Sequence, residues 1–309
     1  MKKTLIIAEA GVNHNGSLDM AKELVRVAHE CGADIVKFQT SKLDSLVSKN
    51  AQMADYQKKN TGTVESQKEM LKKLLLDFDA FTELAAYCRE VGITFLFVTH
   101  DQQEAMSISD HIAVFRAGKL EQIGTPPELY EAPRTSFVAA FIGDTNFFEG
   151  HVASVEGDYC KLKIDGFPTI NLYNDKKVHV GEKIHVSIRP EKFMVSLNKP
   201  EKTDANTNIL HGKVEEVIYL GPHTRYWIRV DDWRVSVVQQ HFGFALDERR
   251  IKWDDDVWLK FEADNAYMLE HYAEDDEQLL ALPDIDETEN TEETTPEAPE
   301  PDKTEKQEE

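Results

Sequence analysis

Long apolar runs are missing from this sequence. No stretch of about 18 or more apolar residues occurs, which is the length that a membrane-spanning helix needs, although 41% of the 309 residues are hydrophobic. Residues 1–7 open like a signal peptide, but the apolar stretch breaks at Glu9 and no small-residue cleavage site follows. We therefore expect a first β-strand there, and neither a membrane span nor a secretion signal.

Cysteine and basic residues are also scarce. The three cysteines (Cys31, Cys88 and Cys160) lie in three different segments without the spacing of metal ligands, which fits a reducing cytoplasm and no disulfide framework. The 35 basic residues are outnumbered by 57 acidic ones and form no basic stripe. We therefore do not expect nucleic acid as a partner.

The net charge of −22 is concentrated at the C-terminal end. Residues 273–309 hold 16 acidic residues against two lysines, a net −14, which leaves −8 for the other 272 residues. This segment has four prolines and no aromatic residue, so it cannot bury enough apolar surface to fold. The pattern predicts a solvated, disordered acidic tail.

Apolar periodicity in the first third of the chain alternates between strands and helices. Ser17 is placed to cap a helix whose apolar residues recur at helical spacing, and Gly32 closes it. Strand–helix–strand units of this kind predict a parallel sheet. The expected strands are residues 5–8, 35–39 and 93–99, and further helices are expected near 66–75 and at 79–91.

The pattern changes after Thr99. Short helices and a hairpin lead to about residue 148, and from there alternating apolar runs are separated by glycine-containing turns. Several short strands at this spacing predict an all-β small barrel. We expect the aromatic residues of this part to lie in its core (Tyr219, Trp227, Trp233, Trp253 and Trp258).

Two motifs near the N-terminus carry a family resemblance. AEAGVNHNG at residues 8–16 and VKFQT at 36–40 resemble the N-terminal part of N-acetylneuraminate (sialic acid) synthases, and the resemblance covers residues 1–96. It implies a (β/α)8 barrel that condenses phosphoenolpyruvate with an N-acetylated amino sugar, aided by a divalent metal such as Mn²⁺. A complete barrel needs about 250 residues, so residues 1–96 are only a partial βα-barrel segment, and the family's metal-binding histidines lie in strands that are absent.

Five residues are the candidates for such chemistry. Glu9, Lys37 and Gln39 fall at the C-terminal ends of strands, where barrel enzymes place their reacting groups. Lys37 would offset the charge of phosphoenolpyruvate, Gln39 would donate hydrogen bonds, and Glu9 would position or deprotonate a reacting group. The alternative is that Lys37 merely pairs with Glu9 across the strand end. Asn13 and His14 are either substrate contacts or loop-forming residues.

The rest of the chain resembles a second family. FVTHDQQEAM at residues 97–106, IAVFRAGKLEQIGTP at 112–126 and FVAAFIG at 137–143 are similar to the ABC importer ATPases for spermidine and putrescine. IRPE at 188–191 and the β-rich remainder resemble their C-terminal regulatory barrel, the TOBE domain, an OB-like fold. This resemblance covers residues 93–270.

The second resemblance implies a role for His100, which would contact the γ-phosphate of ATP and sense its hydrolysis with Mg²⁺. Asp101 and Glu104 form a capping-box-like pair at a helix start, which explains both acids without a function. A phosphate loop of the form G-x-x-x-x-G-K-[ST] is not present in the sequence. His100 is therefore expected to lack a nucleotide site.

The two resemblances meet between Gly92 and Phe97. The expected organisation is a synthase-like segment (1–96), the end of an ABC ATPase domain (97–148), a TOBE-like barrel (149–272) and the tail (273–309). We expect apolar faces to be exposed in residues 1–96, because the sheet partners of either parent are missing.

Three hypotheses follow for the whole chain. The first is a remnant of a polyamine importer ATPase that keeps its regulatory barrel and has lost ATP hydrolysis. Such a remnant would be cytoplasmic, at the inner face of the membrane with the importer's membrane subunits, and could form a homodimer through the barrel. The second is an incomplete N-acetylneuraminate synthase, and the third is an artificial or mis-assembled fusion without function.

Overall fold

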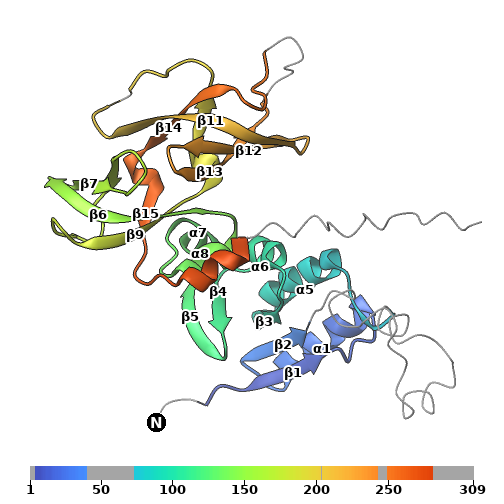
Figure 1. Ribbon diagram of the computed structural model, residues 1–309. Helices are drawn as coiled ribbons and strands as arrows, with labels where there is room; N and C mark the ends of the chain where they lie inside the picture. Colours follow the sequence, from blue (N-terminus) through green and yellow to red (C-terminus); the bar gives the residue numbers. More distant parts are fainter. Residues whose placement is uncertain (1–3, 40–72, 203, 243–248, 281–309) are drawn as a thin grey trace, which may run out of the picture.

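The computed structural model describes residues 4–39, 73–202, 204–242 and 249–280 (Figure 1). The described chain begins with an α/β part and continues into a larger all-β part (Figure 1). This is the predicted order of fold classes. Most of the helix expected near residues 66–75 and residues 281–309 of the expected tail lie outside the described residues.

The N-terminal part is a three-stranded parallel sheet in the order β1-β2-β3. Its strands are β1 (Ile7–Gly11), β2 (Ile35–Gln39) and β3 (Thr94–Val98). Helices α1 (Leu18–Glu30) and α5 (Phe78–Val91) begin at Ser17 and Asp77, whose side chains accept hydrogen bonds from backbone amides of the first turn. The parallel strands predicted from the sequence are therefore present.

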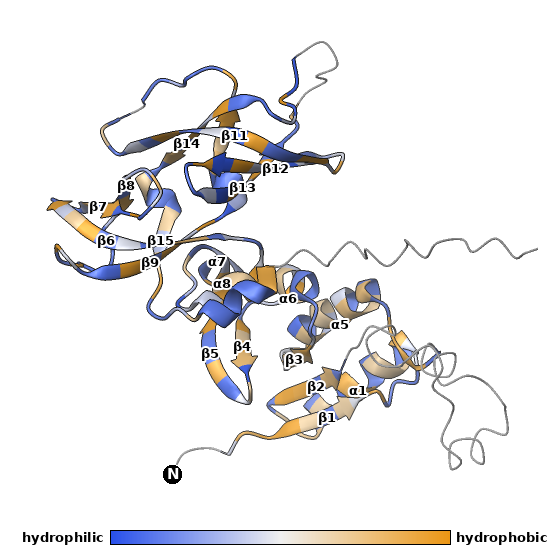
Figure 2. Cartoon of the chain, viewed as in Figure 1, coloured by the Kyte–Doolittle hydropathy of each residue, from blue (hydrophilic) through white to orange (hydrophobic). Residues whose placement is uncertain are grey.

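The two faces of this sheet differ sharply. One face packs on α1 and α5 through buried side chains that include Val36, Phe38 and Leu84. The opposite face keeps apolar side chains in solvent, because Ile7 is 51% and Leu96 38% exposed. The strands are coloured largely as hydrophobic in Figure 2. The expected exposure of an apolar face in residues 1–96 is confirmed.

A small helical segment connects the sheet to the all-β part. It contains α6 (Gln102–Ile108), the hairpin of β4 (Ile112–Arg116) and β5 (Lys119–Gly124), α7 (Pro126–Glu131) and α8 (Ser136–Ile142). Val114, Leu129, Val138 and Ile142 form its core. The hairpin packs against α7 and α8 through this core. It forms a separate two-stranded sheet and does not join the parallel sheet.

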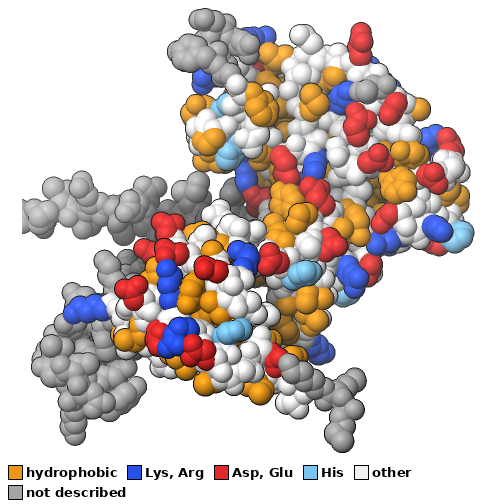
Figure 3. Space-filling model, turned by 180° about the vertical axis from the view of Figure 1, so that it is seen from behind, with side chains coloured by type: hydrophobic (Ala, Val, Ile, Leu, Met, Phe, Trp, Pro, Cys, Tyr) orange, Lys and Arg blue, Asp and Glu red, His pale blue; other side chains and the backbone are white. Residues whose placement is uncertain are grey.

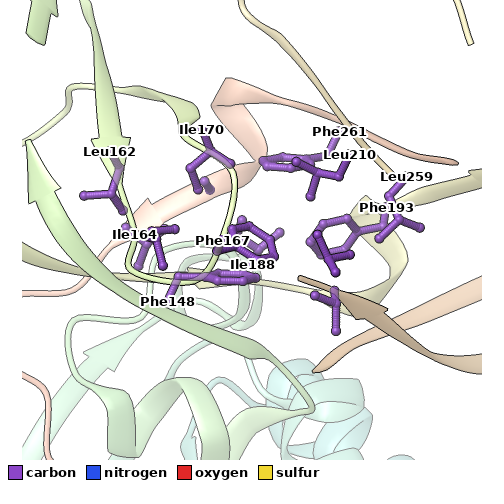
Figure 4. Packing of buried hydrophobic residues seen from close by; sticks show 14 of the residues in the cluster. Phe148, Leu162, Ile164, Phe167, Ile170, Ile188, Phe193, Leu210, Leu259 and Phe261 are labelled. Atoms are coloured by element: carbon purple, nitrogen blue, oxygen red, sulfur yellow. The ribbon is translucent and has the colours of Figure 1, made fainter. Parts of the chain in front are cut away.

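The all-β part consists of two five-stranded antiparallel sheets around one core. One sheet has the order β15-β9-β6-β7-β8 and the other β10-β14-β11-β12-β13. Phenylalanines 148, 167, 193 and 261 meet aliphatic side chains of both sheets in this core (Figure 4). The predicted small OB-like barrel is thus present as two half-barrel sheets.

The bounds of these elements are as follows. The first sheet contains β6 (Asn146–Glu156), β7 (Tyr159–Lys163), β8 (Ile170–Tyr173), β9 (Lys183–Ile188) and β15 (Ala266–Met268). The second contains β10 (Met194–Ser196), β11 (Thr207–Tyr219), β12 (His223–Val230), β13 (Trp233–Gln240) and β14 (Asp256–Glu262). Three short 3₁₀ helices complete the part: η1 (Pro190–Lys192), η2 (Ala263–Asn265) and η3 (Glu274–Leu280).

The prediction that the aromatic residues of this part form the core holds only for Trp233, which packs on Phe148 and Phe167, and is wrong for the exposed ones. Trp253 is 71% and Tyr219 59% exposed, and the other three tryptophans are only partly buried. On β12 the buried positions are Tyr226 and Ile228, so Trp227 between them points outward, where the Arg234 guanidinium lies 4.5 Å from its ring. Alternation along the strands therefore decides burial, and side-chain size does not.

Residues 273–280 were expected to belong to the disordered tail, yet they are part of the packed structure. They include η3, which packs on α8, and Asp276 within it is 3% exposed. The Asp276 carboxylate has specific partners, Arg116 and Ser136, which the acidic composition does not predict. The packed chain thus continues past residue 272.

Candidate functional site

The C-terminal ends of β1, β2 and β3 lie at one edge of the sheet because the strands are parallel. The loop from Val12 to Ser17, the end of β2 at Gln39 and the turn from Thr99 to His100 all leave this edge (Figure 1). Candidate residues from both resemblances therefore share one side of the sheet.

Glu9 and Lys37 are directly opposed on β1 and β2, and Lys37 Nζ donates to Glu9 Oε2 at 2.6 Å. This ion pair is the alternative that the sequence left open. Both side chains lie on the sheet face opposite the helices, with Lys37 27% and Glu9 52% exposed. An anion that approached Lys37 would have to compete with Glu9 for the ammonium group.

Gln39 lies two positions beyond Lys37 on the same open face and is exposed. In a closed (β/α)8 barrel, the face opposite the helices is the barrel interior. Glu9, Lys37 and Gln39 therefore share the face that a closed barrel would turn inward. Here that face is open.

His14 is completely buried beneath the edge, whereas its neighbour Asn13 is exposed. Its Nδ1 accepts a hydrogen bond from the Gly16 amide at 3.2 Å, so the proton of the neutral ring resides on Nε2. The ring packs against Phe38 and Phe81, with centroids 6.1 and 6.4 Å away. Burial lowers the pKa of His14 below its usual value. This geometry favours the loop-forming interpretation of His14 over substrate contact.

Gly16 explains why this loop has its shape. Its φ is +75°, and a Cβ at this position would lie 2.3 Å from the carbonyl oxygen of Lys73. Any other residue would therefore clash with the backbone that passes over the loop. The loop of the AEAGVNHNG motif is built on this close approach.

His100 follows β3 and is exposed. The acids beside it are occupied with local structure: Asp101 Oδ1 accepts from the Glu104 amide at 3.0 Å and caps α6. Glu104 accepts from the Thr99 hydroxyl at 2.7 Å, and that hydroxyl accepts from the Asp101 amide at 2.9 Å. The arrangement resembles a capping box in which the Thr99 hydroxyl bridges the Asp101 amide and the Glu104 carboxylate. Both carboxylates therefore have a structural role at the start of α6.

A cleft of about 900 Å³ opens beside His100 between β3 and β4, and we call it the β3–β4 cleft. Its walls are mainly apolar side chains from β3, α5, α6, β4 and α8. Nucleotide phosphates need a phosphate loop, whose backbone amides and lysine cradle them. The sequence contains no such loop, and the cleft walls are mainly apolar. The described residues at His100 therefore do not fit a Mg²⁺-nucleotide.

A metal site is likewise not found among residues 4–39, 73–202, 204–242 and 249–280. Within these ranges, no group of three or more His, Cys, Asp or Glu side chains is placed to hold a metal ion. The described residues thus do not fit the Mn²⁺ that the synthase resemblance implies. All three cysteines are described, and their thiols are free.

Sequence reasoning missed the residue that joins the helical segment to the all-β part. The buried guanidinium of Arg189 donates to the carbonyl oxygens of Ala139 (2.7 Å), Gly143 (2.8 Å), Asp144 (3.0 Å) and Tyr130 (3.0 Å). It also lies 4.3 Å from the Tyr130 ring. The IRPE motif contains this arginine, but the carbonyls that it binds lie far away in the sequence.

Charged side chains of both signs are mixed on the face of the molecule that Figure 3 shows, and exposed apolar side chains lie between them. No described helix is long and apolar enough to cross a membrane. These observations agree with the composition.

Comparison with known families divides the chain in two. Residues 24–121 match the model of the NeuB family, and residues 186–269 match that of the TOBE domain. The NeuB match runs beyond residue 96 and overlaps the motifs that resemble ABC ATPases. The boundary between residues 96 and 97 therefore stays a prediction.

Curated relatives cover the C-terminal part. The spermidine/putrescine import ATP-binding protein PotA of Protochlamydia amoebophila is 47% identical over 203 residues, which are 65% of this chain and 52% of that protein. PotA of Fusobacterium nucleatum is 40% identical over 212 residues, 67% of this chain and 55% of that protein. The chain spans about half the length of these relatives.

Two solved structures match parts of the chain. The sialic acid synthetase of Leptospira borgpetersenii is 23% identical, with a TM-score of 0.27, and the match covers 35% of this chain and 33% of that one. The molybdate-binding protein ModG is 14% identical, with a TM-score of 0.36, and covers 40% of this chain and 94% of its own. Together, the family matches and the curated relatives show that the chain joins a segment similar to the NeuB family to a segment related to the ATP-binding proteins of spermidine/putrescine importers, with a TOBE domain.

Proposed function

We propose that this chain is a remnant of a polyamine importer ATP-binding subunit that keeps the regulatory all-β part and no longer hydrolyses ATP. The observation that carries the proposal is the unequal completeness of the two parts. The all-β part has a continuous core shared by two full sheets. Within the described residues the parallel sheet has three strands, and the sequence before His100 contains no phosphate loop.

The surroundings of His100 support the loss of hydrolysis. A histidine that senses the γ-phosphate needs the nucleotide held in place beside it by other groups. His100 is exposed next to an apolar cleft, and its acidic neighbours cap α6. In this proposal, His100 is inherited from the parent ATPase but has no bound nucleotide to contact.

The parent's partners give the proposal a cellular setting. The relatives are named import ATP-binding proteins, so the chain would contact the importer's membrane subunits at the inner face of the membrane. The all-β part would form a homodimer there. Size-exclusion chromatography with light scattering tests the dimer, because a monomer at micromolar concentration would refute it.

An ATP assay tests the central claim. Millimolar ATP with Mg²⁺ is expected to leave the melting temperature of the full chain unchanged. We also expect no release of inorganic phosphate from this ATP. Stabilisation by ATP together with hydrolysis that is lost in His100→Ala would overturn the proposal. His179→Ala is the matched control, because this side chain is 85% exposed and lies outside the cleft.

A second candidate is an N-acetylneuraminate synthase-like enzyme, which the NeuB match favours together with the shared open face of Glu9, Lys37 and Gln39. Manganese-dependent consumption of phosphoenolpyruvate by the purified chain would support it. Lys37→Ala should then abolish the activity, whereas Lys161→Ala should not, because Lys161 forms a comparable ion pair with Glu156 elsewhere. No consumption, or activity that Lys37→Ala leaves intact, would reject this candidate.

The third hypothesis, a fusion without function, has its own test. Intact-mass detection of the 35.2 kDa species in a native source would establish the joined chain as a natural product. Two separate products would show that the fusion is an artefact. The NeuB match across residues 24–121 motivates the test, because it spans the expected junction.

A further inference from the structure

Two strand edges without a partner face the β3–β4 cleft. Within the described residues, β3 pairs only with β2, and β4 pairs only with β5. Each of the two strands therefore has one edge whose backbone amides and carbonyls are not used in a sheet. Such an edge is a template for a further strand.

The lining residues show that the cleft runs along these edges. Consecutive residues of β3, from Thr94 to Val98, all line it, and so do consecutive residues of β4, from Ile112 to Phe115. Successive side chains of a strand point to opposite faces. A cleft over one face would touch alternate residues, whereas a cleft at the edge touches all of them.

The size of the cleft suits one strand. Five residues of strand extend about 17 Å, and with about 4.8 Å between strands and about 10 Å between packed layers they occupy about 800 Å³. The cleft has about 900 Å³. One strand of about five residues would therefore fill most of this volume.

The walls require an apolar occupant. Phe97 and Val114 line the cleft from the two strands, and Ala85, Cys88 and Ile142 line it from the helices. Charged and polar groups such as His100, Asp110 and His111 are exposed. An occupant would thus carry apolar side chains between the walls and polar residues at its ends.

The two edges are held apart by fixed contacts. Arg89 of α5 donates to the Ile108 carbonyl of α6 at 3.1 Å and lies 3.5 Å from Asp110. On the other side, Val114 of β4 is packed against Leu129 and Val138. The cleft is therefore braced by α5–α6 and by α7–α8.

We propose that the β3–β4 cleft binds an extended, apolar β-strand of another polypeptide, which pairs with β3 and β4 and completes a sheet in the order β1-β2-β3-strand-β4-β5. The repeating unpaired donors and acceptors of two edges select a strand over a compact small molecule. Binding requires no ATP and no covalent step. The inference therefore stands apart from the proposed loss of hydrolysis.

A synthetic peptide is the probe. Fluorescein-labelled KVTVIVTK, acetylated and amidated, is titrated with the full chain, and anisotropy is expected to saturate. The same peptide with alternate amides N-methylated keeps its side chains but loses the donors along one edge. It therefore cannot pair with both β3 and β4, and we expect binding about tenfold weaker or lost. Hydrogen exchange should slow at residues 94–98 and 112–116 in the complex.

Variants separate the cleft from the rest of the surface. Val98→Lys and Phe115→Lys change exposed residues on its two walls and should each weaken binding about tenfold. Val180→Lys, at a position that is 64% exposed and outside the cleft, should bind like the unaltered chain. Circular dichroism checks that all three fold.

Several outcomes would overturn the inference. The first is the absence of saturable binding at millimolar peptide. The second is equal binding of the N-methylated peptide, which would indicate an ordinary apolar pocket. The third is unchanged peptide binding by both cleft variants. The fourth is a chain that is already a dimer, which Val98→Lys dissociates and excess peptide does not. In that case the cleft is an interface between two copies and not a site for a separate strand, and the inference fails.

Discussion

Arg116 Nη1 lies 2.8 Å from Asp276 Oδ1, an ion pair that joins the β4–β5 hairpin to the 3₁₀ helix η3 near the end of the described chain. Asp276 Oδ2 also accepts from the Ser136 hydroxyl at 2.6 Å, and Ser136 Oγ accepts from the Ala273 amide at 2.9 Å. The carboxylate is 3% exposed, whereas the arginine is 41% exposed. Residues after β15 thus hold the helical segment against the all-β part.

Asp276→Ala should lower the stability of the full chain. The substitution leaves the Ser136 hydroxyl without its acceptor in a buried place, which costs about 1–3 kcal/mol, and the half-exposed arginine adds little. Urea unfolding would measure the loss. Asp256→Ala is the control, because this carboxylate is 74% exposed; equal stability of the two variants would contradict the role of Asp276.

Truncation should locate the end of the stabilising chain. A stop after residue 280 keeps η3 and its contacts, so we expect the melting temperature of the full-length protein. A stop after residue 272 removes Asp276 and the Ala273 amide and should lower the melting temperature by several degrees, as expected for the loss of about 1–3 kcal/mol. If both truncations melt alike, the contacts of η3 contribute nothing measurable.

The sequence predicts those features that depend on local periodicity. Buried runs such as Ile35–Gln39 predict parallel strands, and alternation predicts the all-β part, because both patterns repeat over neighbouring residues. Asp276 has a partner far away along the chain, and composition alone places it in a solvated tail. The carbonyl partners of Arg189 cannot be predicted either, because they also lie far away along the chain.

The candidate site divides in the same way. Family motifs place Glu9, Lys37 and Gln39 on one sheet face, and the structure brings them together there. Motifs do not reveal that Lys37 is already paired or that His14 is buried under Phe38. The motifs do not reveal the β3–β4 cleft, because the unpaired edges of β3 and β4 depend on how the two strands pair and not on their local sequence.

Arg189→Lys should destabilise the junction between the helical segment and the all-β part. A lysine ammonium cannot reproduce the planar fork that serves four carbonyl oxygens and stacks on Tyr130. Leaving two or more buried carbonyls unpaired costs about 2 kcal/mol or more. Denaturant unfolding measures the loss.

Arg229→Lys is the control for Arg189, because its side chain is 43% exposed and pairs with Glu215 at the surface. We expect a change below about 0.5 kcal/mol there. A loss at Arg229 as large as that at Arg189 would show that the fork geometry of the buried arginine has no special role.

The pH dependence of stability should report on His14. Burial lowers the pKa of this ring below the ordinary value of 6.5, so the unfolded chain binds the proton more readily than the folded chain. The contribution of His14 to stability is therefore complete above pH 6.5 and decreases as the pH falls through the lowered pKa. Asparagine at this position can still accept the Gly16 amide but does not titrate.

We therefore expect His14→Asn to reduce the difference in unfolding free energy between about pH 7.5 and about pH 5. Urea unfolding at both pH values gives this difference. His179→Asn, at a side chain that is 85% exposed, should leave the difference as it is in the unaltered chain. A difference that persists in His14→Asn would mean that carboxylates, and not the buried ring beneath the strand ends, set the acid sensitivity of the fold.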